Sequence, residues 1–352
     1  MWQVENHTPF AHHGGFLRDH QARSLWCVWV KATFEFRADQ PVLFQAAQVP
    51  VHLAPLFDDE TLLADSDLTP PKPQVDVVVL AKGYAPQGQD RFTAGISVAG
   101  RSKLMDVVPP ATWSKRGAIV PGTPVPGGVA LTYANAWGGV DDGDNPLGQG
   151  FVQGEAQGKP LPRVLPVGVR PGKPSERPQP MALSPVPKTW PQRRDLGGTY
   201  DDDWSRRRAP LLPHDLDPRY WQAVPEDQRI AREAAPGAPV VLTNLTSPDG
   251  AWSDGILGFA LPHLEFEVAT RFRNIWVQQH AELQTIAMDV EKRRLTLCWQ
   301  ATLPIEASQN DVLVDRTFVA LRDHSGFRVR PDDASLFASG ADASQPMTEG
   351  IA

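Results

Sequence analysis

The sequence is poor in cysteine and in long apolar runs. Its 352 residues include two cysteines, Cys27 and Cys298, each alone in a strand-like stretch, so they provide neither a disulfide framework nor a paired-cysteine metal motif. The first residues lack the basic and apolar segments of a signal peptide, and no run approaches the roughly 18 apolar residues of a membrane span. We therefore expect a reduced, cytoplasmic protein that has no signal peptide and does not interact with a membrane.

Positive charge and catalytic fingerprints are also scarce. The chain has 34 basic and 41 acidic residues, and its net charge of −7 opposes the phosphate contacts on which nucleic-acid binding depends. It contains no Gly-x-Ser-x-Gly elbow, no glycine-rich phosphate loop with its lysine, no HExxH and no dinucleotide fingerprint. We expect no nucleic-acid partner, no cofactor and no enzymatic activity.

Proline, in contrast, is abundant and argues against long helices. The 35 prolines are roughly twice what average usage of about 5% gives, and each removes a backbone donor. Alternation with period two predicts a core strand over 25–36, with one face formed by Trp26, Val28, Val30, Ala32, Phe34 and Phe36. Similar patterns predict further strands at 75–84, 92–98, 102–108, 240–245, 256–261, 264–272, 275–279, 283–290, 294–301 and 312–321.

These patterns predict an all-β protein with two β-sandwich-like sheet lobes. An irregular connector rich in Pro and Arg, with one or two short helices near 219–224 and 226–233, joins the lobes. The final residues are small and polar, which indicates a mobile tail. The expected division is an amino-terminal lobe over 1–155, a connector over 156–234, a carboxy-terminal lobe over 235–330 and a tail over 331–352.

The connector is locally basic. Ten prolines fall between Pro160 and Pro191, and residues 159–208 hold eleven Lys or Arg against five Asp or Glu. This strip could meet an acidic partner, and a solvated loop is the alternative. The possible partner contacts are Arg193, Arg194, Arg206, Arg207 and Arg208.

Three groups of residues were considered as metal sites. Asp201, Asp202 and Asp203 lie near His214 and Asp215, but adjacent residues point in different directions and the group lacks the spacing of a metal loop. The segment 141–145 has a misplaced glycine for a calcium loop, and the adjacent pair His12 and His13 suits solvation. We expect turns at these places and no bound metal.

Carboxylates on strands leave a second class of function open. Glu265, Glu267, Asp289 and Glu291 lie on or beside expected strands, and a pair of carboxylates can cleave a glycosidic bond. Cross-strand ion pairing or solvation is the structural alternative. A carbohydrate-binding or carbohydrate-cleaving β-sandwich therefore competes with a protein-binding function.

Several ordered segments resemble one bacterial family, a domain of unknown function whose members are described as type VI secretion system accessory proteins. The matching stretches lie over about residues 6–300. They are Asn6–Phe10, Val30–Phe34, Ser66–Pro73 with Asp76–Val79, Leu131–Tyr133, Trp137–Gly139, Asn145–Phe151, Trp190–Arg193, Gly198–Trp204, Leu212–Asp215 and Asp227–Gln228.

This resemblance implies an effector adaptor or chaperone that carries no catalytic residues. Its partner is a secreted toxin or a PAAR-like tip domain, which it helps to load onto the VgrG spike; a structural component of the secretion particle is a further alternative. Glycine and aromatic chemistry indicate a structural role for the recurrent motif residues, with a buried seam around Tyr200 and Trp204. These residues are Gly138, Gly139, Asn145, Gly148, Trp190, Gly198, Tyr200, Asp201 and Trp204.

Overall fold

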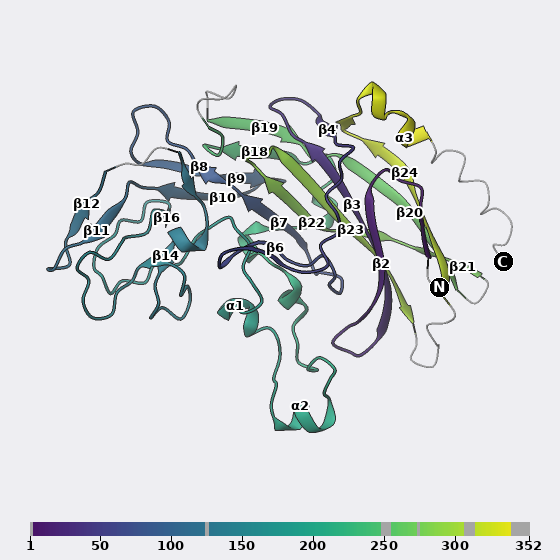
Figure 1. Cartoon of the computed structure of the whole chain (residues 1–352), viewed down its shortest axis with the longest axis horizontal. Coiled ribbons are helices and arrows are strands. Elements are labelled where there is room, and N and C mark those ends of the chain that lie inside the picture. Colours follow the sequence, from purple (N-terminus) through teal and green to yellow (C-terminus); the bar gives the residue numbers. More distant parts are fainter. Residues whose placement is uncertain (1–2, 124–126, 248–254, 273–274, 306–313, 339–352) are drawn as a thin grey trace.

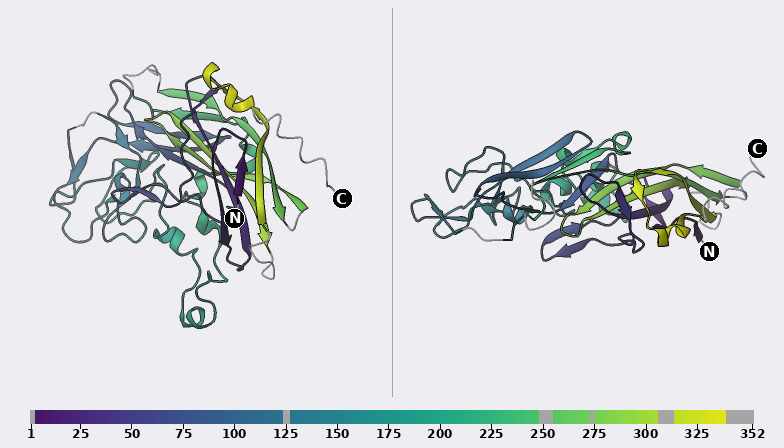
Figure 2. Two further views of the ribbon diagram at one scale, coloured as in Figure 1. Left: turned by 45° about the vertical axis from the view of Figure 1, so that its right-hand side comes forward. Right: turned by 90° about the horizontal axis from the view of Figure 1, so that it is seen from above.

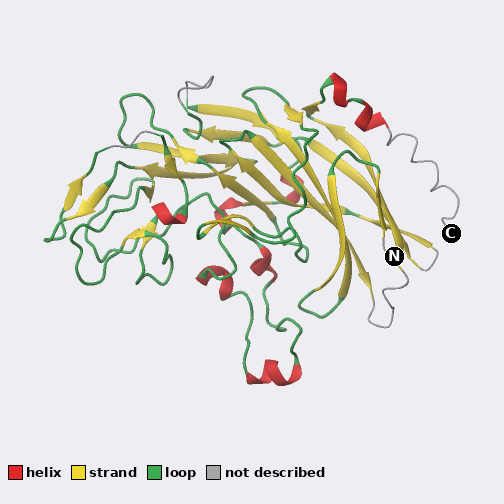
Figure 3. Ribbon diagram, viewed as in Figure 1, coloured by secondary structure: helices red, strands yellow, loops and turns green. Residues whose placement is uncertain are grey.

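The computed structural model describes residues 3–123, 127–247, 255–272, 275–305 and 314–338. Strands account for 42% of the structure and helices for 9%, which confirms the all-β class (Figure 3). The molecule is flat and elongated, with the first and last strands at one end and the loops that follow β10 at the other (Figure 2).

An eight-stranded mixed sheet forms one layer (Figure 1). Its order is β17-β7-β22-β23-β3-β4-β25, and β2 pairs with β3 beside this path. Pairs β7–β22 and β4–β25 are parallel, and the others are antiparallel. The strands are β2 (Ala11–Arg18), β3 (Ser24–Glu35), β4 (Val42–Phe44), β7 (Val75–Leu80), β17 (Arg229–Ile230), β22 (Ala281–Asp289), β23 (Arg294–Ile305) and β25 (Phe327–Arg328).

Two smaller sheets supply the rest of the strands that enclose the core. The four-stranded sheet has the order β1-β24-β20-β21, and the five-stranded sheet has the order β16-β10-β9-β18-β19. The four strands are β1 (Gln3–Asn6), β24 (Val314–Ser325), β20 (His263–Phe272) and β21 (Ile275–Gln279). The five are β16 (Val164–Pro166), β10 (Arg101–Val107), β9 (Phe92–Val98), β18 (Pro239–Thr243) and β19 (Ile256–Ala260).

One cluster of buried side chains draws on all three sheets, so they enclose a single core. Trp26 on β3, Val240 on β18 and Val268 on β20 all belong to it. The six residues expected on one face of the 25–36 strand are in this cluster, as the period-two pattern predicts. The opposite face of β3 contributes to a small second cluster with Val51 and Cys298.

Strands from the two ends of the chain are interleaved, so the expected lobes 1–155 and 235–330 are not separate sheets. Strand β3 pairs with β23 along its whole length, β7 pairs with β22, and β9 pairs with β18. Pairing between strands more than 100 residues apart leaves no local trace in a sequence. The proposed boundaries at 155 and 235 are therefore corrected to one sandwich, on which the connector lies.

Several short strands and turns lie outside the three main sheets. Two small clusters, one around Trp113 and Trp137 and one around Tyr133 and Trp190, pack the loops that follow β10. The minor strands are β5 (Leu56–Asp58), β6 (Thr61–Ala64), β8 (Lys82–Gly83), β11 (Ala111–Trp113), β12 (Ile119–Pro121), β13 (Val129–Ala130), β14 (Trp137–Gly138) and β15 (Gln149–Gly150), and η1 is a 3₁₀ turn (Tyr133–Asn135).

The connector is irregular, as the prolines predict, but its helices differ from those expected. Helices α1 (Pro191–Arg194) and α2 (Asp202–Arg207) precede the predicted positions, where 3₁₀ turns η2 (Pro218–Trp221), η3 (Glu226–Gln228) and η4 (Arg232–Ala234) occur instead. Asp217 caps η2 by accepting the backbone N–H of Arg219 at 2.8 Å.

The first part of the expected mobile tail, residues 331–338, has regular structure and packs on the sandwich. It forms a 3₁₀ turn η6 (Pro331–Asp333) and a short helix α3 (Ser335–Ala338). The Phe337 ring packs against Phe44 at 5.0 Å and Phe10 at 6.2 Å between centroids. The remainder of the expected tail, 339–352, lies outside the described residues.

Candidate functional site

Charged side chains lie buried on the outer face of the eight-stranded sheet, away from the main core. Because side chains alternate along β3, the face opposite Val30 carries Lys31. Residues 45–73 and the connector cover this face, so the charges there need partners. Three ion pairs supply them, and we call this group the buried clasp: Lys31, Asp65, Asp67, Lys72, Asp76 and Arg193.

The first pair joins β3 to the covering segment. Lys31 Nζ lies 2.7 Å from Asp67 Oδ2, and the two side chains are 4% and 8% exposed. His52 Nδ1 lies 3.2 Å from the same ammonium group, and the His52 backbone N–H donates to Asp67 at 2.7 Å. Burial, with the Lys31 charge as a further cause, lowers the pKa of His52. His52 is therefore neutral at pH 7 and accepts from Lys31.

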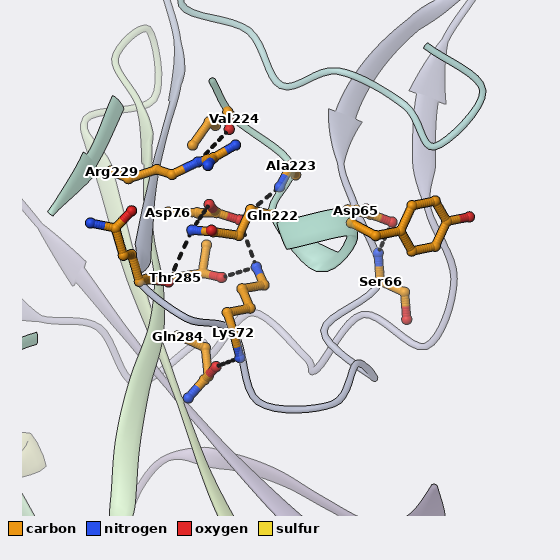
Figure 4. Close-up of polar contacts among 12 residues, drawn as sticks. Asp65, Ser66, Lys72, Asp76, Gln222, Ala223, Val224, Arg229, Gln284 and Thr285 are labelled. Atoms are coloured by element: carbon orange, nitrogen blue, oxygen red, sulfur yellow. Dashed lines mark hydrogen bonds and ion pairs between the residues drawn. The ribbon is translucent and has the colours of Figure 1, made fainter. Parts of the chain in front are cut away.

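The second pair is the most deeply buried (Figure 4). Lys72 Nζ lies 2.8 Å from Asp76 Oδ2 and donates to Thr285 Oγ1 at 2.9 Å. Asp76 is on β7 and fully buried, and its Oδ2 also accepts the backbone N–H of Ala223 in the connector at 2.8 Å. One carboxylate thus ties the sheet, the 66–73 segment and the connector together.

The third pair holds the middle of the connector. Arg193 in α1 donates from Nη2 to Asp65 Oδ2 at 2.8 Å and to the Tyr220 carbonyl at 2.9 Å, and from Nη1 to the Val186 carbonyl at 2.6 Å. Arg193 is 3% exposed. The sequence suggested Arg193 as a partner contact. Its guanidinium is instead buried and ion-paired with Asp65, which lies 128 positions away in the sequence.

A small cavity in the clasp is too small for a substrate and holds no reactive nucleophile. It measures about 40 Å³ and is lined by Lys31, Asp67, Lys72 and Cys298, among others, which is room for about one water molecule. Burial raises the pKa of the Cys298 thiol well above its ordinary value. A protonated, enclosed thiol is a poor nucleophile.

A polar groove of about 590 Å³ lies beside the clasp. Lys103 on β10 donates to Asp227 Oδ1 at 2.9 Å and Gln228 Oε1 at 2.7 Å, and burial lowers its pKa against the opposing effect of Asp227. Burial raises the pKa of Tyr133 on the same wall. Exposed Gln192 lines the groove too. The groove can exchange hydrogen bonds with a polar partner.

A cleft of about 460 Å³ with a mixed polar and apolar lining opens between β20 and the strands β22 and β23. Trp299 and Phe266 meet edge to face in it, with ring centroids 5.1 Å apart. At its rim, Glu282 pairs with Arg232 at 3.3 Å and Glu265 with His263 at 3.4 Å. Trp299 is only 6% exposed, so it offers little stacking surface for a sugar.

The four carboxylates considered for glycoside chemistry do not share this cleft. Glu265 lines it, whereas Asp289 ends β22 at the opposite end from the cleft. Asp289 pairs with Lys292 at 3.0 Å and Arg294 at 3.3 Å. Glu291 accepts the Tyr84 hydroxyl at 2.8 Å.

The other candidate arginines lie at or near the protein surface. Arg194 pairs with Asp195 at 3.4 Å and Arg207 with Asp203 at 3.0 Å. Arg206 is exposed on α2. Arg208 donates to the carbonyls of Leu212 at 2.8 Å and His20 at 2.6 Å, so it holds the connector against the β2–β3 turn.

Motif residues assigned a structural role fall into two groups. Fully buried Asn145 donates to the carbonyls of Tyr133 at 2.9 Å and Trp137 at 2.6 Å, and a Cβ on Gly138 would lie 2.1 Å from the Asn145 carbonyl oxygen. Trp190 is also buried. Gly139 and Gly148 lie in the same tightly packed turn region.

The expected buried seam around Tyr200 is absent. Tyr200 is 56% exposed and Trp204 is half-buried, since their segment leaves the sandwich instead of entering it. Asp201 caps α2 by accepting the backbone N–H of Trp204 at 2.8 Å. Gly198 has φ of +83°, which suits glycine.

The residues considered for metals are engaged in local turns. Asp215 accepts from the Thr199 backbone and hydroxyl, and Asp142 accepts the backbone N–H groups of Asp144 and Asn145. Across the described ranges, no group of three or more His, Cys, Asp or Glu side chains is placed to hold a metal ion.

Lys31, Asp67, Lys72 and Asp76 lie in the segments that carry the family resemblance, but no role was predicted for them from the sequence. The available signal was a single charge within an apolar strand, as at Lys31 in β3 and Asp76 in β7. Lys and Asp are rarely fully buried unless paired. Such a charge predicts a buried partner without telling which residue it is.

Comparison with known families places these observations in context. A family model described as uncharacterized protein conserved in bacteria, DUF2169, matches residues 21–300. The chain belongs to this family. The match covers the whole clasp and most of the sandwich of this DUF2169 protein. No curated protein and no solved structure gives a significant match. Within the described part of the chain, no helix is long and apolar enough to cross a membrane.

Proposed function

We propose that this DUF2169 protein is a non-enzymatic adaptor or chaperone of the type VI secretion system. In the bacterial cytoplasm it binds a secreted toxin, or the PAAR-like tip domain attached to it, and assists loading onto the VgrG spike. The ordered motifs that resemble secretion accessory proteins support this assignment. The match to DUF2169 supports a bacterial origin.

One structural observation carries the proposal: the clasp acids are consumed in holding the connector to the sheet. Asp65, Asp67 and Asp76 each have a cationic partner within 2.8 Å. Paired, desolvated charges of this kind fix the geometry of the segments that they join. A fixed connector offers a surface of constant shape to another protein, which suits binding.

A stable complex requires only a small part of the molecular surface. Stable interfaces bury on the order of 1,200 to 2,000 Å² in total. The chain exposes 17741 Å² in all, and the connector crosses one face of the sandwich and extends beyond it (Figure 1). The carbohydrate alternative receives less support, because Glu282 at the rim of the cleft between β20 and β22 is ion-paired with Arg232 and Trp299 is buried.

Co-expression with the products of adjacent genes tests the proposal. We expect a tagged full chain to retain one toxin or spike-tip protein through size-exclusion chromatography, and a deletion strain to lose export of that toxin alone. An unrelated toxin exported by the same cells serves as the control. No retained partner together with undiminished export contradicts the adaptor function. Recovery of the protein in the secreted particle at fixed stoichiometry favours the structural-component alternative.

A further inference from the structure

An arm leaves the connector between Leu196 and Leu216, and its Arg208 also donates to the His20 carbonyl in the β2–β3 turn. It extends away from the sandwich, with α2 at its far end (Figure 1). The backbone N–H of Asp217 donates to the Leu196 carbonyl at 3.0 Å, which brings the two ends of the arm together. We call residues 196–216 the arm.

The arm is ordered by its own contacts. Thr199 donates from its hydroxyl to Asp215 at 2.7 Å, and Trp204 donates from Nε1 to the Leu211 carbonyl at 2.8 Å. At Gly198, a Cβ would lie 2.7 Å from Pro213. These contacts join the two halves of the arm, the segment before α2 and the segment after it, at several positions. The arm therefore has a fixed shape before any partner arrives, which reduces the entropy lost on binding.

The arm presents an aromatic pair that the fold does not bury. The Tyr200 ring meets Trp204 edge to face, with centroids 4.7 Å apart, and Tyr200 is 56% exposed. Tyr and Trp are the residue types most enriched in the energetic centres of protein interfaces. Neither residue belongs to a hydrophobic cluster of the sandwich. The exposed ring thus contributes little to the core.

A cation at the arm lacks a carboxylate partner within the described chain. Arg207 is held by Asp203 at 3.0 Å, whereas Arg206 donates from Nε to the Asp202 carbonyl and makes no ion pair there. Its guanidinium can still bind a carboxylate in bidentate fashion.

We propose that the arm is the docking element for the cargo, with Tyr200 and Trp204 as anchors. The complementary partner surface is an apolar pocket with a carboxylate at its rim, which Arg206 meets. This inference rests on the proposed function, because the partner is the toxin or spike-tip protein. It places the principal contact on the arm rather than in the polar groove or in the cleft between β20 and β22.

Affinity measurements with the co-expressed partner test the arm. Tyr200→Ala in the full chain is expected to weaken binding about 10- to 30-fold, as for an interface hot spot, and Arg206→Glu is expected to weaken it about 10-fold or more. Phe57→Ala removes an aromatic residue that is 51% exposed on β5, and Arg194→Glu reverses an exposed arginine outside the arm. Both controls are expected to bind like the parent, and all four variants to melt like it.

The outcomes separate the two proposals. If the parent chain binds the partner but Tyr200→Ala and Arg206→Glu bind equally well, the arm is not the docking element, while the adaptor function stands. If the parent retains no partner, the adaptor function fails and the arm proposal fails with it. If only the control variants lose binding, the docking surface lies elsewhere on the protein.

Discussion

The two ends of the stretch from Arg193 to Arg208 differ although their residue types are alike. Arg193 is 3% exposed and paired with Asp65, whereas Arg206 lies on the exposed arm without an ion pair in the described chain. Trp190 is buried and Trp204 is half-buried. The burial of an arginine is thus decided by an acid supplied from a distant segment. Clasp residues serve the fold, and arm residues remain available to a partner.

The largest expected effect comes from breaking the deepest clasp pair. Asp76→Ala leaves the Lys72 ammonium group buried without its counter-ion and frees the Ala223 backbone N–H. Removal of one partner of a buried pair costs about 3 to 5 kcal/mol. Urea unfolding measures this loss. Asp203→Ala, in the arm, is the control and is expected to change stability by less than about 1 kcal/mol. Equal free energies of unfolding for the two variants would contradict the distinction between clasp and arm.

A second substitution compares the two arginines directly. Arg193→Ala leaves buried Asp65 uncompensated and removes donors from two carbonyls, so we expect a loss on the order of 3 kcal/mol. Arg206→Ala is expected to stay within about 0.5 kcal/mol of the parent. Chemical denaturation of both variants provides the comparison. A stable Arg193→Ala protein would show that the connector does not depend on this pair.

The arm tryptophan is expected to have an intermediate effect. Full burial of Trp204 would predict a loss of about 3 to 5 kcal/mol for Trp204→Ala. Because the ring is half-buried and outside the main core, we expect about 1 to 2 kcal/mol, with the loss confined to the arm. Thermal melting and limited proteolysis measure the two parts. A loss as large as that of Asp76→Ala would make the arm an integral part of the sandwich.

The smallest effect concerns pH and a pair outside both regions. Burial alone raises the pKa of Asp106, but hydrogen bonds from Arg91, Gly168 and Thr93 outweigh it and lower the pKa below its ordinary value. The unfolded chain then binds the proton more readily, so this stabilisation is present above the unfolded pKa of 3.8 and is lost as pH falls through the folded pKa. Asp106→Asn should melt below the parent at pH 7 and converge with it in acid. A constant difference would contradict this pKa assignment.

The sequence allowed prediction of single strands and of one face of β3, because alternation is a local property. It also predicted the turn at Asp142 from local hydrogen-bond chemistry. It did not predict that β3 pairs with β23, or that Lys31 forms an ion pair with Asp67. Those contacts join residues that are distant in the sequence, so no local pattern indicates them. Tyr200 was wrongly predicted to be buried, because the same sequence pattern, an aromatic residue after glycine, occurs in turns of the core and in projecting arms.

Hydrogen–deuterium exchange on the full chain, alone and bound to its co-expressed partner, tests the central claim most directly. The account predicts that the backbone N–H groups of Lys72 and Ala223 in the clasp exchange slowly in both states. It also predicts that partner binding slows exchange in the arm, residues 196–216. Rapid exchange at the clasp in the free protein, or an unchanged arm in a verified complex, would contradict the account.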